Sequence, residues 1–279
     1  MQRLTGKVAV VTGAARGQGR SHCVRLAEEG ADIVAVDICE DINTIHYSMA
    51  TEDDLDETAR LVEAKGRRVL SRKKDVRDAA GMQEIIDEAV DELGAIDVVA
   101  ANAGVCDIGM TWEHSQEDWN NIIEINLTGV FNTVRPAVPK MIEAGRGGSL
   151  IITSSLVGLR GMPNCAPYAT TKSGLVSFTQ SLAMELGPHS IRVNSIHPTN
   201  VDTPMIHNQG TYRVFRPDVP SDREVTRDEF IEASAEMNAL PISWVDAIDV
   251  SNAVVWLASD EARFVTGIQL PVDAGALIK

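Results

Sequence analysis

Short apolar runs alternate with amphipathic stretches along this chain. An apolar run bounded by turn residues is typical of a buried strand, and apolar positions three or four residues apart are typical of a helix with one buried face. The predicted strands are Val8–Val11, Ile33–Val36, Ile96–Ala100, Leu150–Thr153 and Ile191–Ile196, and the predicted helices are Gly19–Glu29, Leu55–Lys65, Ala79–Leu93 and Tyr168–Leu186. This alternation predicts an α/β fold, a doubly wound parallel sheet with helices on both faces.

Two segments are longer than connections in such a fold need to be. They are Ile38–Asp54, after the predicted strand Ile33–Val36, and Asp202–Pro241, after the predicted strand Ile191–Ile196. Both leave from the carboxyl ends of strands, where open α/β sheets bind ligands, and long loops there often act as lids. We expect residues 202–241 to form a substrate lid. No repeat or linker interrupts the pattern, so the sequence predicts one domain over residues 1–279.

Composition narrows the class of protein. A chain of 279 residues with 44% hydrophobic content fits one soluble α/β domain. The net charge of −15 argues against nonspecific binding to nucleic acid or to anionic membranes. No apolar run approaches the length of a membrane span, and the N-terminus leads directly into a strand pattern without a signal-peptide core. We therefore expect a cytoplasmic protein with neither nucleic acid nor membrane as a partner.

The cysteines and histidines predict no metal site. The four cysteines are scattered and form no Cys-x-x-Cys pair. The six histidines show no His-x-x-x-His spacing. A packed or solvated side chain is the simpler role for each of them.

Tyr168 and Lys172 lie four residues apart in PYATTKSG, which places both side chains on one face of the predicted helix. A nearby ammonium favours the phenolate and lowers the pKa of a phenol, ordinarily about 10. The pair predicts a general acid/base that works near neutral pH. Ser155, thirteen residues earlier, supplies a hydroxyl that can hold a substrate oxygen. A surface tyrosine packed along a helix is the alternative interpretation of Tyr168.

A glycine-rich turn, TGAARGQG, lies between the first predicted strand and the first predicted helix. In this arrangement Gly13 permits a tight turn, Gly17 lets the backbone approach a pyrophosphate, and Gly19 lets the helix pack closely on the strand. The helix N-terminus offers free N–H groups to phosphates. The turn predicts a dinucleotide site and therefore hydride transfer.

The end of the second strand predicts which dinucleotide is bound. Asp37 would accept hydrogen bonds from the ribose hydroxyls and repel a 2′-phosphate, which favours NAD over NADP. Arg16 is the opposite signal, because a guanidinium can pair with that phosphate. We give Asp37 the greater weight, since it ends the strand that faces the ribose, although it could also cap a turn. The long segment beginning at Ile38 must then pass the adenosine end of the cofactor.

Two further turns complete the predicted cofactor site. Asp75 and Val76 follow a third strand pattern, which lies between the strands Ile33–Val36 and Ile96–Ala100, and can hold the adenine edge. Asn102, Ala103 and Gly104 follow the fourth and form a small-residue turn against which a cofactor can lie. An ordinary turn that ends a strand is the alternative for this second group.

These motifs, in this order, resemble those of the short-chain dehydrogenase/reductase superfamily, from Lys7 to the C-terminus. The resemblance implies a Rossmann-type fold and a catalytic set of Ser155, Tyr168 and Lys172. It adds Asn126, in INLTG, as a residue thought to hold a water that links the lysine to solvent. A helix-bending asparagine satisfied by backbone groups is the alternative for Asn126.

The match to the superfamily is imperfect at two cofactor positions. After the sixth strand the family has Pro-Gly followed by a threonine near the nicotinamide amide, and Pro198, Val201 and Thr203 match this pattern. Thr199 replaces the glycine, and Gln18 replaces a commoner aliphatic residue in the glycine turn. These departures concern the fine geometry of the cofactor site and leave the fold unaffected.

Loop sequence resembles one branch of the superfamily more closely. The insertion beginning VDICEDI, the stretch TYRVFRPDVP and the ending IQLPVDAG are similar to mycofactocin-associated, carveol dehydrogenase-like enzymes. The resemblance implies secondary-alcohol substrates, including terpenoid ones, tightly held NAD, and mycofactocin as an external redox acceptor. It also implies a homotetramer that pairs the helices matching Ser115–Ile142 and Tyr168–Leu186.

The sequence as a whole predicts an NAD-dependent dehydrogenase that interconverts a secondary alcohol and its ketone. Its substrate pocket is expected to include Val105, Leu156, Val157 and Met162. One alternative is a reductase with freely exchanging cofactor, acting on 3-oxoacyl or ketosteroid substrates. Another is an NAD-binding sensor without catalysis, which would have no need of an intact Ser155, Tyr168 and Lys172 set.

Overall fold

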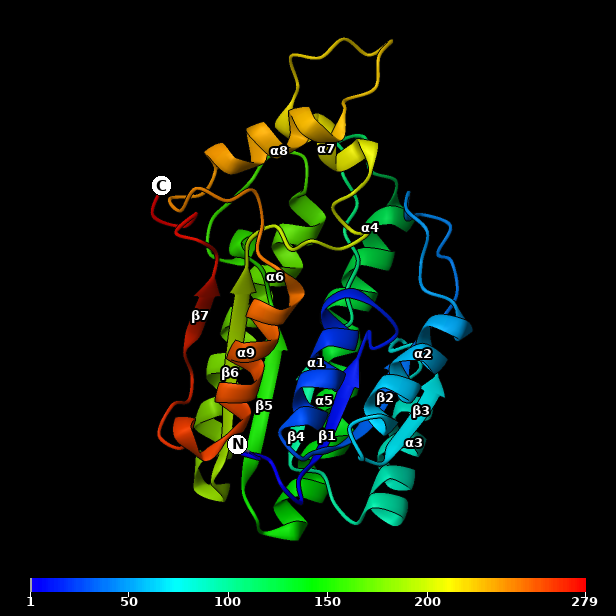
Figure 1. The fold of residues 1–279 in the computed structure, drawn as a ribbon, viewed down its shortest axis with the longest axis vertical. Coiled ribbons are helices and arrows are strands. Elements are labelled where there is room, and N and C mark those ends of the chain that lie inside the picture. Colours follow the sequence, from blue (N-terminus) through cyan, green and yellow to red (C-terminus); the bar gives the residue numbers. More distant parts are fainter. Residues whose placement is uncertain (1) are drawn as a thin grey trace.

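A seven-stranded parallel sheet runs through residues 2–279, the part of the chain that the computed structural model describes (Figure 1). Its strands are β1 (Val8–Thr12), β2 (Asp32–Asp37), β3 (Val69–Lys73), β4 (Val98–Ala101), β5 (Gly148–Thr153), β6 (Ile191–Pro198) and β7 (Gln269–Val272). Their order is β3-β2-β1-β4-β5-β6-β7, and every neighbouring pair is parallel. The strand order reverses between β1 and β4, which is where open α/β sheets bind ligands.

Helices cover both faces of the sheet (Figure 1). One face is packed by helices α1 (Gly17–Glu28), α2 (Glu52–Glu63) and α9 (Ala247–Ala258), and the other by α3 (Ala79–Leu93), α4 (Gln116–Ile123), α5 (Gly129–Ala144) and α6 (Ala166–Leu186). The predicted fold class, a single doubly wound α/β domain, is confirmed.

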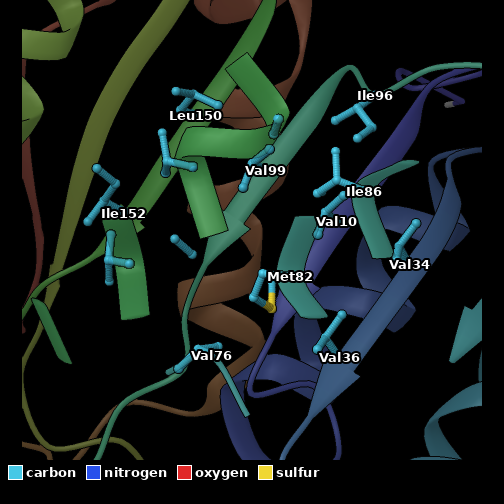
Figure 2. Packing of buried hydrophobic residues seen from close by; sticks show 14 of the residues in the cluster. Val10, Val34, Val36, Val76, Met82, Ile86, Ile96, Val99, Leu150 and Ile152 are labelled. Carbon is cyan, nitrogen blue, oxygen red and sulfur yellow. The ribbon is translucent and has the colours of Figure 1, made fainter. Parts of the chain in front are cut away.

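The two faces of the sheet are built from alternating side chains of the same strands. In β1, Val8 and Val10 belong to the core under α3, α5 and α6, whereas Ala9 and Val11 belong to the core under α1 and α9. Figure 2 shows Val10 among neighbours from adjacent strands and from α3. Because successive strand residues point to opposite faces, a one-residue slip would exchange the two cores, and burial therefore fixes the register.

The first long segment is shorter than predicted. Helix α2 begins at Glu52, and the side chain of Thr51 accepts a hydrogen bond from Asp54 N while the Asp54 carboxylate accepts one from Thr51 N. This reciprocal cap fixes the start of the helix. The inserted segment therefore ends at Thr51, before the predicted boundary of Asp54.

The second long segment contains two helices. Helices α7 (Gln209–Phe215) and α8 (Arg227–Glu236) lie within it, beyond the carboxyl ends of the strands (Figure 1). Its aromatic side chains form a small core of their own, in which the rings of Tyr212 and Phe230 stack 4.5 Å apart. This core makes the segment a folded cap over the edge of the sheet where ligands bind.

None of the helices in residues 2–279 is both long and apolar enough to cross a membrane. Helix α6 has the length, at 21 residues, but it carries Lys172 and several hydroxyl side chains. Of these residues, Tyr168 and Lys172 line the site described next.

Candidate active site

A pocket opens at the carboxyl ends of the strands, between the glycine turn and the cap formed by α7 and α8. Every residue predicted to bind the cofactor lines this pocket, namely Gly13, Arg16, Gly17, Gln18, Gly19, Asp37, Ile38, Asp75, Val76, Asn102, Ala103, Gly104, Tyr168, Lys172, Pro198, Val201 and Thr203. Ser155 lines it too, whereas Asn126 is fully buried behind its wall. The fold therefore brings the predicted site residues to one place.

The glycine turn has the shape and polarity that a diphosphate needs. Gly13 has a φ of +67°, and a Cβ there would lie 2.9 Å from Ala103 Cα. At Gly19 a Cβ would lie 1.9 Å from Gly13 O. No side chain caps the start of α1, whose N-cap is Arg16, and no acidic residue lies in its first turn. The N–H groups at this end remain available to an anion, so the turn fits a dinucleotide.

Asp37 uses part of its carboxylate to hold the backbone around it. Its Oδ2 accepts a hydrogen bond from Ala15 N at 2.9 Å, and its Oδ1 accepts one from Cys39 N at 3.1 Å. The Asp37 carboxylate therefore does cap a turn, as the alternative interpretation expected. Each carboxylate oxygen has a second lone pair, so the same side chain keeps acceptors that can face a ribose diol in the pocket.

The side chains of Arg16 and Gln18, two residues of the glycine turn, differ in their hydrogen bonding. The Arg16 guanidinium donates to Ser48 O in the segment between β2 and α2, which turns its charge toward that segment. The carboxamide Oε1 of Gln18 is buried at the pocket, without a hydrogen-bond partner among residues 2–279. An unpaired buried amide is costly, and a ligand with hydrogen-bonding groups would satisfy it.

The Asn-Ala-Gly turn joins neighbouring strands beneath the pocket. Asn102 Nδ2 donates to Thr12 O at 3.0 Å, and Thr12 Oγ1 accepts from the backbone N–H groups of Asn102 and Ala103. A Cβ at Gly104 would lie 3.3 Å from Lys172 Nζ. The turn thus ties β1 to β4 and leaves room beside the lysine.

Asp75 and Val76 are held by neighbours on both sides. The Asp75 carboxylate accepts from Arg77 N at 2.8 Å and pairs with the Arg77 guanidinium. Val76 O accepts from Asn132 Nδ2 at 2.9 Å. These bonds fix the outer wall of the pocket beyond β3.

Tyr168 and Lys172 share one face of α6, as predicted. Lys172 Nζ lies 5.5 Å from the centre of the Tyr168 ring and donates to Thr153 O, at the end of β5, at 2.8 Å. Ser154 Oγ donates to Lys172 O at 2.8 Å. The end of β5 therefore fixes the position of Lys172 and, through Ser154, that of the neighbouring Ser155.

Burial dominates the protonation of this pair. It raises the pKa of Tyr168, against a smaller opposing effect of the Ser155 hydroxyl, and it lowers the pKa of Lys172 to about 8. Low-dielectric surroundings disfavour both charged forms, which explains the opposite directions. The prediction of a phenol that titrates near neutral pH is therefore not met in the protein by itself, because burial raises the pKa of Tyr168.

His197 is a site residue that sequence reasoning missed. Its Nδ1 lies 2.8 Å from Ser155 O and its Nε2 lies 2.8 Å from Ser195 Oγ. A carbonyl only accepts, so Nδ1 carries the proton and donates to Ser155 O. Burial lowers the pKa of His197, so the ring is neutral and its Nε2 accepts from Ser195. His197 therefore positions the backbone of Ser155 from β6.

Asn126 anchors the wall of the pocket. It lies in a π-helical turn, Glu124–Thr128, that separates α4 from α5. Its Oδ1 accepts from Val105 N and its Nδ2 donates to Val105 O, both at 2.8 Å. This satisfies the side chain with backbone, as the alternative interpretation expected. Single π turns inside helices frequently mark functional sites.

Thr199, which replaces the family glycine, ties the strand end to the cap. Its Oγ1 donates to Asn238 Oδ1 at 3.4 Å, and Asn238 Nδ2 donates to Ile242 O at 2.7 Å. Asn238 directly follows the α8 region and is buried. The departure from the family pattern thus fixes the end of the segment 202–241 beside the pocket.

The inner half of the pocket, around Ser155 and Tyr168, is mainly apolar. It includes the four predicted residues, Val105, Leu156, Val157 and Met162, and residues of the segment 202–241, namely Met205, Ile206, Thr211, Val214, Phe215 and Met237. The predicted lid therefore contributes to the pocket wall. Residues 2–279 contain no group of three or more His, Cys, Asp or Glu that could hold a metal.

Comparisons with known proteins agree with this geometry. The model of the short chain dehydrogenase family matches residues 7–213. The chain is 48% identical to (−)-trans-carveol dehydrogenase of Rhodococcus erythropolis, over all of both chains. It resembles the crystal structure of carveol dehydrogenase from Mycobacterium avium in complex with NAD, with 48% identity, a TM-score of 0.96 and 99% of each chain covered. A short chain dehydrogenase from Mycobacterium paratuberculosis bound to NAD is 40% identical, with a TM-score of 0.91, 99% of this chain covered and 100% of that one.

Proposed function

The chain belongs to the short-chain dehydrogenase family, and from this premise we propose that it interconverts uncharged cyclic secondary alcohols, of terpenoid size, and their ketones. It is an NAD-dependent alcohol dehydrogenase/reductase of the carveol dehydrogenase-like branch. The observation that carries the proposal is the distribution of charge around the pocket.

Charged side chains lie only in the cofactor half of the pocket, apart from the catalytic lysine. Within residues 2–279, those that line it are Arg16, Asp37, Lys74, Asp75 and Lys172. The first four come from the glycine turn and the ends of β2 and β3. The inner half offers aliphatic, aromatic and sulfur-containing side chains around Ser155 and Tyr168. A carboxylate or phosphate on the substrate would remain unpaired there, which favours an uncharged alcohol.

Three side chains account for the chemistry. Ser155 holds the substrate oxygen, and Tyr168 removes the proton of an alcohol or returns it to a ketone. NAD, when bound, supplies the acceptor for the hydride of the carbinol carbon. Lys172 holds the nicotinamide ribose, and its ammonium favours the phenolate. Support for these roles is their convergence on one pocket and the position of Lys172 beside the Tyr168 ring.

The cofactor-binding residues have separate tasks in this proposal. The glycine turn receives the diphosphate, Asp37 the adenosine ribose, and Asp75 with Val76 the adenine edge. Pro198, Val201 and Thr203 border the nicotinamide end. Asn126 acts by fixing Val105 and, through the π turn, can support the water-linked proton path that the family resemblance implies.

The substitution Tyr168→Phe tests the proposed chemistry. It removes the acid/base and keeps the ring, so turnover of a cyclic alcohol such as menthol or carveol should fall by roughly 100-fold or more, while NAD still binds. Turnover is followed with an artificial electron acceptor, and NAD binding by titration calorimetry. Near-normal turnover in this variant would refute the assignment.

We further propose that NAD is retained between turnovers and is reoxidised in place by an external acceptor, for which the branch resemblance suggests mycofactocin. The support is the segment 38–51, which follows Asp37 and contributes Ile38, Ile42, Tyr47, Met49 and Ala50 to the pocket lining. Denaturing the purified protein and assaying the supernatant for NAD tests retention. If no NAD is released and added NAD sustains rapid multiple turnover, a freely exchanging reductase is the better description.

A homotetramer completes the proposal. The helices expected to pair carry large exposed apolar side chains, with Phe131 on α5 exposed by 46% and Met184 on α6 by 74%. Such side chains are typical of surfaces that another chain covers. A monomeric mass by light scattering at micromolar concentration would contradict this.

A further inference from the structure

The segment between β2 and α2 is a folded part of the pocket. Ile42 and Ile45 are buried in the same hydrophobic cluster as the strand residues under α3 and α5. Tyr47 and Met49 pack against that cluster from the edge. We call residues 38–51 the strap. Its burial distinguishes it from a solvated excursion of the surface.

The strap is held at separate points along the pocket. Near the glycine turn, the Arg16 guanidinium donates to Ser48 O. At α4, Asn121 Nδ2 donates to Thr44 Oγ1 at 3.1 Å. In Figure 1 the strap lies above α2, on the same side of the molecule as α4.

The remaining contacts of the strap reach the substrate half of the pocket. Tyr47 Oη accepts a hydrogen bond from Cys106 N at 3.2 Å, and His46 Nε2 lies 3.8 Å from Asp107 Oδ1. Cys106 and Asp107 belong to the loop after β4, just beyond Val105. Two consecutive strap residues therefore meet two consecutive residues of this loop, of which Cys106 lines the pocket.

The Tyr47 contact carries more weight than the His46 contact. The His46 side chain is 78% exposed, so its attraction to Asp107 is screened by water. Tyr47 lines the pocket, and burial raises the pKa of its phenol, which keeps it protonated. Within residues 2–279, Tyr47 Oη is the acceptor found for Cys106 N–H. Detaching the strap would leave this backbone donor without its partner.

We propose that Tyr47 is a positioning residue whose hydroxyl ties the strap to the loop after β4, so that one element both retains NAD and forms a wall of the substrate pocket. This inference rests on the proposed function of the same pocket. Release of NAD past the strap then requires the Tyr47–Cys106 bond to break. Cofactor retention becomes linked to the geometry of the substrate wall.

The rate of NAD release tests the proposal. Wild type and Tyr47→Phe are loaded with radiolabelled NAD, chased with excess unlabelled NAD, and sampled on desalting columns. Loss of one hydrogen bond to a partly buried backbone donor should speed release by roughly three- to tenfold. The ring remains in place, so the substitution tests the hydroxyl alone.

Two control variants separate the hydroxyl from general loosening. Tyr212→Phe removes a phenol hydroxyl that lies 3.1 Å from His207 Nδ1 in the cap, away from the strap. His46→Ala changes the neighbouring, exposed residue of the strap. Both should release NAD within about twofold of wild type, since neither removes a partner of a buried strap contact.

The experiment distinguishes the role proposed for Tyr47 from the proposal that NAD is retained between turnovers. A ratio of release rates between Tyr47→Phe and wild type below twofold would overturn the role of Tyr47, as would equal acceleration in His46→Ala. Fast release from wild type itself would refute NAD retention, and the ratio would still test Tyr47. Failure of the wild-type protein to bind NAD would overturn both.

Discussion

Asn126→Ala distinguishes an anchoring side chain from a residue that serves only a proton relay. The substitution removes both hydrogen bonds to Val105, each 2.8 Å long, at a site with no solvent exposure. It leaves a buried N–H and a buried C=O of Val105 without partners. Val105 lines the pocket, so the backbone that moves is part of the active site.

The expected loss of stability follows from these two groups. Each buried, unsatisfied backbone group costs about 1–3 kcal/mol, which gives roughly 2–6 kcal/mol for the pair. Water entering the small space left by the carboxamide would bring the loss toward the lower end of this range. A residue that only held a relay water would lower turnover and leave stability nearly unchanged.

Urea denaturation at saturating NAD measures this loss, and Asn194→Ala is the matched control. Asn194 is also fully buried and makes the same two-way bridge, donating to Val265 O at 2.9 Å and accepting from Ile268 N at 3.2 Å. It lies on β6, outside the pocket lining. Both variants should lose comparable stability, but only Asn126→Ala should lower kcat at a temperature where both are folded.

A loss below about 0.5 kcal/mol in Asn126→Ala would refute the anchoring role, because backbone groups left unpaired cannot be that inexpensive. Equal loss of kcat in both variants would show that reduced stability, rather than displacement of Val105, lowers the activity.

Two further substitutions test the electrostatics of the site. Asp37→Ala should narrow or reverse the preference for NAD over NADP in titrations, because it removes the charge that repels a 2′-phosphate; equal affinity of wild type for both would refute its role. Burial lowers the pKa of Lys172 from 10.5 to about 8, so between these values the unfolded chain binds the proton and the folded chain does not. The ammonium therefore weakens the fold below pH 8 by about 3 kcal/mol, and the penalty fades as pH rises toward 10.5. Lys172→Met should abolish turnover and raise the urea midpoint at pH 7 but not at pH 10; a lower midpoint at pH 7 would show that the lost bond to Thr153 O matters more.

Local signals allowed most of the fold and the cofactor site to be predicted. Helix α3 has the predicted bounds, since Asp78 caps its start and Gly94 ends it in the left-handed region. Gly13 and Gly19 were identified because a strand–turn–helix arrangement dictates what each glycine must do. In these places neighbouring residues determine the geometry, so the sequence is sufficient.

The strap and His197 depend on contacts between distant residues. The hydroxyl of Tyr47 meets Cys106 N across 59 positions, and His197 meets Ser155 O across 42. The hydrophobic periodicity of the sequence carries no information about contacts between residues so far apart. A polar run such as the one around Tyr47 is typical of an exposed loop, and only the burial of Ile42 and Ile45 shows that it is folded.

Protonation is the feature that sequence spacing predicted least well. The separation of Tyr168 and Lys172 predicts their proximity, but the pKa of each depends on how much water the completed fold excludes. Burial favours the neutral phenol and the neutral amine alike. The spacing therefore predicts that the two residues are close, but not the protonation state that burial favours.

The same burial gives the two directions of the reaction different requirements. A neutral Tyr168 can donate a proton to a ketone, so the protein by itself is prepared for reduction. Oxidation needs the phenolate, which burial opposes. Below about pH 8 Lys172 is mainly charged, and in a site that excludes water its ammonium attracts a phenolate far more strongly than it would at the surface. Alcohol oxidation therefore depends on keeping Lys172 protonated while Tyr168 is not. The Thr153 carbonyl, 2.8 Å from Lys172 Nζ, helps to maintain that state because it accepts a hydrogen bond from the ammonium.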